Sequence, residues 1–530
     1  MVIPLITAII SPDQLNFDFI SNFLNLSYFF QNNLILVIIG LVLVVFIFKN
    51  LYLIFLYSQF IKFATSLEAS VSNTIYSKYL HQPYIFFIKN KSSNLISNLT
   101  AETRLFTNSY TIPIFFFIVE SLVVISIFIL ILFLSSRSLL FLILFMGVVG
   151  LILSTLLRKN VKKWGEIRST NDNFKVSYLQ QGIESIKQTL MQNNQNLFIN
   201  NFKKHIDSNA DVTNKSFIVS QLPRILYEIL GIIALLCFIT VLVTSGKLNS
   251  QSLIELGFYV AVAYRIVPSL NKILVSYQQL KFSDVVLGII SKELKLDVEK
   301  NNQPSKNIDF NNIIKVKNLS FYYPDSKIKS LNNINLEITK GDFIGIKGES
   351  GSGKTTLLNI IIGLLEPHSG FVEVDDHNIY ENIYHWRSKI GYVPQSTLLI
   401  DDTIKNNISF GIKNENIDED RIFEVVKLTR LDKLINNLSE GINSQVGHNG
   451  SNLSGGEKQR IGIARALYLN PEILAMDEPT SSLDTKTEVD IIDSINGLIG
   501  KKTIIVVSHR DSLISRCNKI FKINDGKLIE

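Results

Sequence analysis

Five long apolar stretches in the first half of this 530-residue chain limit what it can fold into. The hydrocarbon core of a bilayer is about 30 Å thick, and a helix needs about 20 apolar residues to cross it. Each stretch reaches about that length, so the sequence predicts an α-helical membrane domain. The spans are expected at residues 34–57, 112–134, 139–157, 225–244 and 253–275.

The polar segments between the spans indicate which side of the membrane each one faces. Cytoplasmic loops of membrane proteins carry an excess of Lys and Arg. Residues 58–110 and 158–222 are long and rich in both, whereas the short loops at 135–138 and 246–252 hold only Arg137 and Lys247. We therefore expect the two long segments and the C-terminal half of the chain to lie in the cytoplasm.

The first 33 residues do not complete the expected pattern of spans. Residues 11–33 contain no Lys or Arg and carry apolar residues near helical spacing, which predicts an amphipathic helix at the outer membrane surface. Residues 1–10 would then have to cross the membrane, but ten helical residues rise only about 15 Å. We expect a six-span pattern with its first span truncated, either because translation begins upstream or because the protein is shortened.

The composition of the chain changes near residue 290. Residues 291–312 are polar, rich in Lys and Asn, and include Pro304, which is typical of a linker. Short apolar strands and helical patterns alternate after it, which predicts a soluble α/β fold. We expect a membrane domain at 1–290, a linker at 291–312 and a soluble domain at 313–530.

The clearest motif of the C-terminal half is G-E-S-G-S-G-K-T-T, which fits the phosphate-binding pattern G-x-x-x-x-G-K-[ST]. An apolar strand precedes it and an apolar helix follows, as the motif requires. Backbone N–H groups and the helix N-terminus bind phosphate oxygens, the lysine neutralises phosphate charge, and the threonine hydroxyl binds Mg²⁺. A glycine-rich turn without a ligand is the alternative. The predicted ATP-binding residues are Gly348, Glu349, Ser350, Gly351, Ser352, Gly353, Lys354, Thr355 and Thr356, with Thr355 also a metal ligand.

A second set of motifs follows the phosphate loop. L-S-G-G-E at 453–457 opens an apolar-periodic helix, and the apolar strand 473–477 ends in Asp477 and Glu478. Together with the phosphate loop, these motifs resemble those of ABC-transporter ATPases. The resemblance implies a P-loop α/β domain that hydrolyses ATP with Mg²⁺ as cofactor.

The same resemblance assigns roles to single residues. Glu478 matches the general base that polarises the attacking water, and Asp477 matches the residue that holds Mg²⁺. Gln395 matches a loop residue that senses Mg²⁺ and contacts the membrane domain. His509 matches the switch histidine at the γ-phosphate, and Tyr323 matches the aromatic ring that stacks on adenine. Taken singly, Gln395, His509 and Tyr323 are better explained as a loop polar group, a core histidine and a strand aromatic. Their order around the two motifs favours the ATPase roles instead.

One chain cannot complete such a nucleotide site. In the family, the L-S-G-G-E segment of one subunit covers the ATP that is bound by the phosphate loop of the other. One ATPase domain per chain therefore implies a dimer. Because Glu478 and His509 are both present, a homodimer would have two competent sites. The residues assigned to nucleotide binding in this way are Ser454, Gly455, Gly456, Glu457 and Asp484.

The order of domains narrows the resemblance. A membrane domain with long cytoplasmic extensions, followed by an ATPase, resembles ABC exporters with six spans per subunit. Short helices near 83–89 and 193–202 are the expected coupling elements. The stretches H-Q-P-Y, Q-L-P-R and Y-R-I-V-P-S-L-N resemble the subgroup that includes the lipid-linked oligosaccharide flippases of bacterial protein N-glycosylation.

Ionisable residues within spans are costly and are candidates for function. The predicted substrate-cavity residues are Lys49, Arg224, Arg265 and Lys272, and the acids Glu120 and Glu228 lie in the same spans. Four cations and two acids leave two surplus positive charges per subunit, which suit a diphosphate headgroup. The alternative is that Arg224 pairs with Glu228, that Glu120 pairs with another cation, and that the Lys49 side chain extends to the membrane surface.

These observations favour an ATP-driven homodimeric flippase that moves a lipid-linked oligosaccharide or a similar amphipathic lipid to the outer face. The alternatives are an exporter of other lipids, peptides or drugs, a non-transport ABC ATPase, and a truncated, inactive subunit. A net charge of +6 is small for this length and does not suggest nucleic-acid binding. We expect a multi-pass protein of the bacterial inner membrane with its ATPase domain in the cytoplasm.

Overall fold

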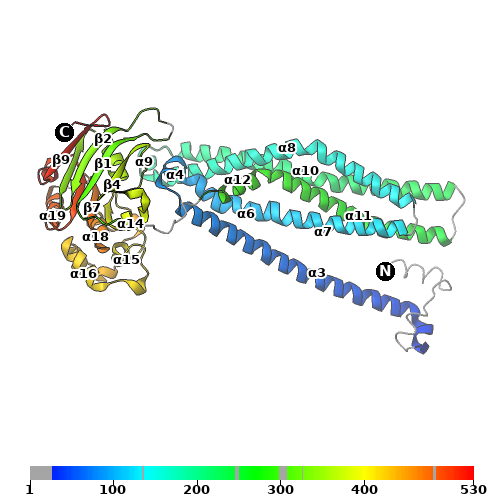
Figure 1. Cartoon of the computed structure of the whole chain (residues 1–530). Helices are drawn as coiled ribbons and strands as arrows, with labels where there is room; N and C mark the ends of the chain where they lie inside the picture. Colours follow the sequence, from blue (N-terminus) through cyan, green and yellow to red (C-terminus); the bar gives the residue numbers. More distant parts are fainter. Residues whose placement is uncertain are drawn as a thin grey trace. The chain divides into compact units, whose positions relative to one another are not determined.

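The computed structural model of the chain describes residues 27–133, 137–244, 250–297, 307–324, 326–481 and 485–529 (Figure 1). The chain divides into two compact units. The helical unit comprises Met1–His81 and Asn90–Val298, and the sheet unit comprises Gln82–Lys89 and Glu299–Glu530. Each unit is described by itself.

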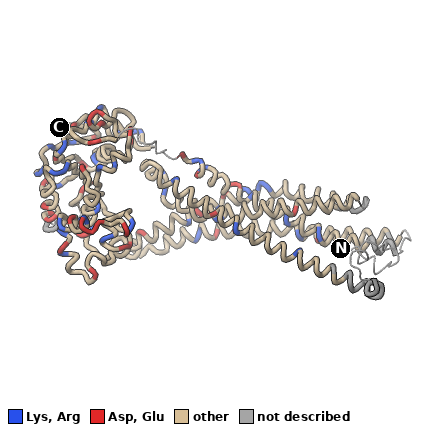
Figure 2. The backbone as a smooth tube through the Cα atoms, turned by 60° about the horizontal axis from the view of Figure 1, so that its bottom comes forward, with Lys and Arg blue, Asp and Glu red and all other residues tan. Residues whose placement is uncertain are grey.

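Long helices form the helical unit. Among the described residues, five helices are long and apolar enough to cross a membrane, and one falls on each of the five predicted spans. Figure 2 shows long stretches without charged residues along part of these helices and charges gathered along the remainder. The helices are α3 (Ser27–Leu80), α5 (Ser92–Ser97), α6 (Thr103–Phe106), α7 (Ile112–Phe133), α8 (Arg137–Glu184), α9 (Ile186–Met191), α10 (Gln195–Thr244), α11 (Ser250–Phe282) and α12 (Asp284–Leu294), with π-helical turns η2 (Asn98–Glu102) and η3 (Thr107–Thr111).

Small residues allow α8, α10 and α11 to pack closely. A Cβ atom on Gly150 would lie 2.4 Å from the hydroxyl of Tyr227, and one on Gly165 would lie 2.0 Å from the carbonyl oxygen of Phe282. Close approach at small residues is how membrane helices gain packing energy, because lipid is as apolar as their side chains. Helix α3 separates from this bundle along much of its length (Figure 1), but the Phe60 and Phe115 rings, with centroids 3.7 Å apart, join it to α7.

The polar extensions of these helices pack through buried hydrogen bonds. Glu102 is fully buried and accepts from Arg168 at 3.4 Å and from Ser169 at 3.2 Å. Asn98 donates to Tyr79 and to Glu293, both at 3.3 Å. These contacts tie α3, α8 and α12 to η2, which explains why the segment 58–110 is polar in sequence yet helical.

One expected element differs from the structure, and another lies largely outside the described residues. The predicted short helix at 193–202 is not separate: the short helix is α9, which ends at Met191, and α10 begins at Gln195. Asn193 has a left-handed φ of +53° and makes the turn between them, a conformation that asparagine tolerates. The predicted amphipathic helix at 11–33 lies largely outside the described residues, and residues 27–33 are the start of α3.

The sheet unit contains two sheets. The six-stranded sheet has the order β10-β9-β3-β8-β7-β6, and its strands are parallel except for β10. Strands β7 and β8 are buried at every position, as expected for a parallel sheet covered on both faces. The strands are β3 (Phe343–Gly348), β6 (Ile390–Val393), β7 (Ile473–Asp477), β8 (Thr503–Val507), β9 (Lys519–Asn524) and β10 (Lys527–Leu528).

The second sheet is antiparallel, with the order β2-β1-β4-β5. Its strands are β1 (Ile313–Phe321), β2 (Leu331–Thr339), β4 (Ser369–Val374) and β5 (His377–Asn378). The helices of the sheet unit are α4 (Tyr84–Lys89), α13 (Lys354–Ile361), α14 (Ile383–Ser388), α15 (Ile404–Ile408), α16 (Glu419–Leu428), α17 (Asp432–Asn437), α18 (Gly455–Tyr468), α19 (Thr485–Asn496) and α20 (Asp511–Ile514), with 3₁₀ turns η4 (Ile379–Glu381), η5 (Asn414–Asn416), η6 (Gly441–Asn443) and η7 (His448–Gly450).

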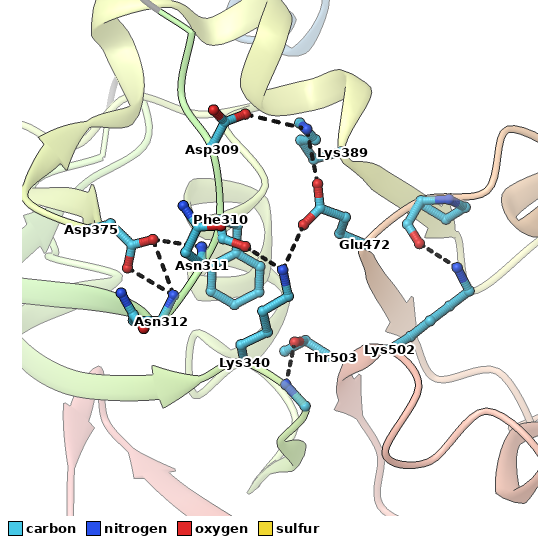
Figure 3. Close-up of polar contacts among 12 residues, drawn as sticks. Asp309, Phe310, Asn311, Asn312, Lys340, Asp375, Lys389, Glu472, Lys502 and Thr503 are labelled. Atoms are coloured by element: carbon cyan, nitrogen blue, oxygen red, sulfur yellow. Dashed lines mark hydrogen bonds and ion pairs between the residues drawn. The ribbon is translucent and has the colours of Figure 1, made fainter.

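A polar network holds the chain where it enters β1 (Figure 3). Asp375 accepts the backbone N–H groups of Asn311 at 2.5 Å and Ile313 at 2.8 Å. Lys340 donates to the carbonyl of Phe310 at 2.6 Å and pairs with Glu472 at 3.1 Å. The residues just before β1 are therefore part of the folded sheet unit.

The short predicted helix near 83–89 is present as α4 and belongs to the sheet unit. Ile85 packs against the hydrophobic core of that unit. Pro83 and Ile85 line a cavity of about 490 Å³ together with Phe321 and Leu364. This segment lies between α3 and α5 in the sequence, but by its packing it is part of the sheet unit.

Candidate functional site

The phosphate loop runs from the end of β3 into α13, with the geometry that its glycines predict. Gly351 and Gly353 have φ values of +81° and +104°, which favour glycine. A Cβ atom on Gly348 would lie 2.1 Å from the carbonyl oxygen of Ile523, so this position has no room for a side chain. The loop can therefore present backbone N–H groups closely to an anion at the N-terminus of α13.

Lys354 lies inside this loop. Its ammonium group donates to the carbonyl oxygens of Gly348 at 3.0 Å and Glu349 at 2.8 Å, and the residue is only 6% exposed. Burial lowers the pKa of Lys354, and the nearby carboxylates of Glu478 and Asp477 act in the opposite direction. A buried cation beside the phosphate loop would be better satisfied by phosphate oxygens than by neutral carbonyls.

Thr355 and Asp477 form the candidate magnesium site. The Thr355 hydroxyl donates to the Asp477 carboxylate at 3.1 Å, which places two hard oxygen ligands side by side. Asp477 is the last residue of β7 and is 5% exposed. Burial and the neighbouring Glu478 raise its pKa, against the hydrogen bond from Thr355. This donor set fits Mg²⁺, whose charge would compensate the buried carboxylate.

Glu478 is held from two sides directly after β7. Gln395 donates its amide N–H to one carboxylate oxygen at 2.9 Å, and the His509 Nε2 lies 3.3 Å from the other. The backbone of Glu478 is left-handed, with φ of +46°, and its N–H donates to the carbonyl of Val507 at 2.8 Å. The structure thus brings together the three residues that the sequence predicts to be catalytic, around the edge of the phosphate loop.

The L-S-G-G-E segment forms the N-terminus of α18. Ser454 is the N-cap, and its backbone N–H and hydroxyl donate to the Glu457 carboxylate at 2.7 Å and 2.8 Å. Gly455 has open space around its Cα, which leaves room for an anionic group at the helix N-terminus. Within the described residues, no hydrogen bond or ion pair joins this segment to the phosphate loop of the same chain.

The predicted adenine platform is only partly tested by the structure. The Tyr323 hydroxyl lies 3.1 Å from the Thr356 hydroxyl, so this ring is next to the phosphate loop. The neighbouring Tyr322 is 42% exposed and stacks on His368, with ring centroids 3.6 Å apart. Asp484 lies outside the described residues.

The four predicted cavity cations have different partners in the structure. Lys272 on α11 pairs with Glu120 on α7 at 3.0 Å, and Arg224 pairs with Glu228 on the same helix at 2.9 Å. The alternative pairings considered from the sequence are therefore confirmed for both acids. A carboxylate within reach neutralises each of these two cations.

The remaining two cations differ. Lys49 lies 4.7 Å from the centroid of the Phe46 ring on its own helix, α3. Arg265 on α11 is exposed, and among the described residues no ion pair joins it to a carboxylate. No described interaction connects Lys49 or Arg224 with Arg265 or Lys272. Arg265 is consequently the strongest candidate for contact with an anionic ligand.

Comparison with known proteins agrees with this geometry. The sequence model of the family described as "ABC transporter" matches residues 331–481, and the one described as "ABC transporter transmembrane region" matches residues 2–264. A solved structure titled as a bacterial Atm1-family ABC exporter with ATP bound superposes with a TM-score of 0.78 at 20% sequence identity, covering 89% of this chain and 82% of that one. That likeness establishes the fold.

Three named relatives are similar to different shares of this chain. An ATP-dependent lipid A-core flippase of Coxiella burnetii is 38% identical over 46% of this chain and 41% of its own length. One from Francisella novicida is 29% identical over 86% of this chain and 77% of its own length. A leukotoxin export ATP-binding protein of Aggregatibacter actinomycetemcomitans is 34% identical over 54% of this chain and 40% of its own length. The matches to the Coxiella and Aggregatibacter proteins thus span less than half of those relatives.

The two matched families, together with the assembled phosphate loop, Asp477 and Glu478, show that the chain belongs to the ABC transporters. Within that class, this chain fuses a transmembrane domain to one ATPase domain and has the fold of an ABC exporter.

Proposed function

We propose that this chain is an ATP-driven flippase which, as a homodimer, moves a lipid-linked oligosaccharide or a similar lipid with an anionic headgroup to the outer face of the bacterial inner membrane. The ATPase part is supported by the constellation around Glu478. The lipid part is supported by Arg265, which is exposed on α11 and has no ion pair among the described residues, and by the printed names of several relatives.

The residues of the ATPase site each have a defined task in this proposal. The phosphate loop and Lys354 bind the phosphates. Thr355 and Asp477 would hold Mg²⁺, which would supply neutralisation of the phosphate charge. Glu478 orients and polarises the attacking water. Gln395 and His509 fix the two carboxylate oxygens of Glu478 in position, at 2.9 Å and 3.3 Å. This arrangement raises the rate mainly by positioning and charge stabilisation.

A second copy of the chain completes the nucleotide site in this proposal. The N-terminus of α18 is available for an anion, yet it makes no described contact with its own phosphate loop. A homodimer would place this N-terminus over the γ-phosphate that the partner binds. It would form two equivalent sites, because Glu478 and His509 are present in every copy.

Arg265 carries the proposed headgroup contact. A guanidinium group offers a planar pair of donors that matches two phosphate oxygens, and it stays charged at all relevant pH values. Its position on α11 is within the apolar part of the chain, where an unpaired charge needs a ligand or water. An anionic headgroup that enters from the cytoplasmic leaflet would supply that partner.

The proposal is tested with the full chain in proteoliposomes. ATPase activity is measured with added polyprenyl-diphosphate-linked glycan, with the same glycan on a neutral lipid, and with no additive. We expect stimulation by the diphosphate lipid alone. Equal stimulation by both lipids, or none by either, would contradict an anionic headgroup as substrate.

A second candidate, export of a polypeptide, is favoured by one observation, the similarity to a leukotoxin export protein. Stimulation of the ATPase by an unstructured peptide and not by the diphosphate lipid would support this alternative instead.

A further inference from the structure

The Glu120–Lys272 ion pair is more buried at its acid than the Arg224–Glu228 ion pair. Glu120 is 4% exposed and both of its carboxylate oxygens are bound, one by the Ser269 hydroxyl at 2.7 Å and the other by the Lys272 ammonium at 3.0 Å. Glu228, by contrast, has a side chain that is 54% exposed and binds only Arg224 among the described residues. Glu120 is therefore fixed in place, whereas Glu228 is an exposed partner.

The Lys272 side chain is more exposed than the Glu120 carboxylate that it binds. Its side chain is 49% exposed, and its ammonium group lies 5.7 Å from the centroid of the Phe116 ring on α7. A half-exposed ammonium group on a flexible stem can exchange one acceptor for another. The buried carboxylate cannot follow it, because Ser269 and the surrounding helices hold Glu120.

Arg265, Ser269 and Lys272 lie at positions i, i+4 and i+7 of α11, so they share one face of this helix. The face presents two cations, one of which is neutralised by Glu120. The net charge offered to a ligand is thus set by the acid on α7 as well as by the cations on α11. In the low dielectric of a membrane, such a difference of one charge strongly affects anion binding.

From this geometry we propose that Glu120 is a specificity-determining residue: by holding Lys272 it limits the negative charge of the headgroup that the face of Arg265 and Lys272 accepts. The inference rests on the proposed lipid-flippase function and names a determinant of its substrate class. With Glu120 ionised, Arg265 is the cation on this face that has no ion pair among the described residues, and Lys272 is held by Glu120. Without the Glu120 charge, Lys272 is released as well, and the preference for diphosphate over monophosphate increases.

The test uses the full chain in detergent and measures binding of polyprenyl monophosphate and polyprenyl diphosphate of equal chain length by native mass spectrometry. We expect Glu120→Gln to improve diphosphate over monophosphate binding by about tenfold relative to wild type, or about 1.4 kcal/mol. Glutamine keeps an acceptor for Ser269, so the helix contact is retained.

Two further variants make the result specific. Glu228→Gln removes the other acid from the spans and should leave the ratio of diphosphate to monophosphate binding within about twofold of wild type. The double variant Glu120→Gln with Lys272→Met removes the released cation and should return the ratio to the wild-type value. Melting temperatures in the same detergent identify variants that fail to fold.

Three outcomes would overturn the inference. They are an unchanged ratio in Glu120→Gln, an equal change in Glu228→Gln, and a gain that persists in the double variant. Binding of neither lipid to wild type or variant overturns this inference together with the proposed function. Binding with the expected changes but without flipping in vesicles supports the inference and contradicts the flippase function alone.

Discussion

The Glu478 side chain has little freedom, since Gln395 and His509 each bind one of its carboxylate oxygens. Glu478→Gln removes the negative charge that polarises water in the proposed role of Glu478, and it leaves Lys354 and the phosphate loop unchanged. We expect ATP turnover to fall at least about 100-fold while ATP binding stays intact. Steady-state hydrolysis and equilibrium binding of a fluorescent ATP analogue measure the two effects.

The control for this variant is Glu424→Gln, at an exposed glutamate that pairs with Arg421 far from the loop in sequence. It should hydrolyse ATP at the wild-type rate. Hydrolysis by Glu478→Gln within a few-fold of wild type would remove Glu478 from the role of general base.

Asp477 shows a conflict between stability and function. Burial and Glu478 raise the pKa of Asp477 above its ordinary value. A carboxyl group whose pKa is raised in the folded state binds a proton more readily there than in the unfolded state. Its ionised form therefore lowers the free energy of unfolding at neutral pH. This loss disappears as the pH falls through the folded pKa. Asp477→Asn should therefore raise Tm without Mg²⁺ at pH 7 by about 2–4 °C, although it loses a metal ligand.

Thermal unfolding of the detergent-solubilised protein with EDTA measures this effect, and the gain over wild type should shrink at lower pH. Addition of Mg²⁺ and ATP should stabilise wild type more than the variant. A lower Tm for the variant at pH 7 would show that the Asp477 carboxylate stabilises the free protein.

Sequence reasoning identified the chemistry of these residues but not their geometry. The spacing of G-x-x-x-x-G-K-T and of L-S-G-G-E predicted which groups surround ATP, because phosphate binding needs particular atoms at particular places. The left-handed backbone of Glu478 and the pairing of Glu120 with Lys272 depend on contacts between distant segments. A single sequence shows which residues could form ion pairs but not which of these pairs form.

At the scale of elements, the segment just before β1 is held by the charged side chains of Asp375 and Lys340 (Figure 3). Burial alone would raise the pKa of Asp375, but the N–H donors of Ile313, Asn311 and Asn312 outweigh it, so the pKa lies below the ordinary value. A carboxylate with a depressed folded pKa adds stability above the unfolded pKa of about 4, and this stability is lost as pH falls through the folded value.

Asp375→Asn should lower Tm at pH 7 by about 2–4 °C, because an amide oxygen accepts the three backbone N–H groups more weakly. The difference from wild type should shrink below about pH 4. Asp376→Asn is the matched control. The Asp376 side chain is 84% exposed, and the backbone of Asp376 is also left-handed, with φ of +69°. Equal losses in both variants would show that Asp375 has no special role.

The elements themselves were predictable to different degrees. Apolar length alone located all five described membrane-crossing helices, because the bilayer leaves few alternatives to a long apolar helix. The short helix predicted at 193–202 was misplaced, since α9 at Ile186–Met191 is polar at several positions and its boundary depends on the turn at Asn193. That α4 belongs to the sheet unit follows from packing of Ile85, which local sequence does not reveal.

At the scale of the whole molecule, a nucleotide site that is shared by two copies of the chain can be distinguished from one that a single chain completes. Lys354→Ala disables the phosphate loop, and Ser454→Arg fills the space at the N-terminus of α18. Each variant alone should lose at least about 90% of ATPase activity, because contacts to the phosphates are lost. A mixed dimer would hold one doubly defective site and one intact site.

Co-expression of the two variants with different affinity tags, followed by tandem purification, isolates the mixed dimer. We expect its ATPase rate to recover well above that of either variant purified alone. Two copies of Lys354→Ala with different tags serve as the control and should stay inactive. No recovery in the mixed dimer would argue that each chain completes its own nucleotide site.

The most direct test of the proposed flippase is ATP-dependent movement of a polyprenyl-diphosphate-linked glycan across proteoliposomes, measured by enzymatic access to the glycan. Wild type should expose the glycan on the far side only with ATP and Mg²⁺. Arg265→Ala should slow this movement by about ten- to a hundred-fold, since a charge-assisted contact contributes about 1.5–3 kcal/mol, and Arg265→Lys should be intermediate. Normal flipping by Arg265→Ala, or no ATP-dependent flipping by wild type, would contradict the account.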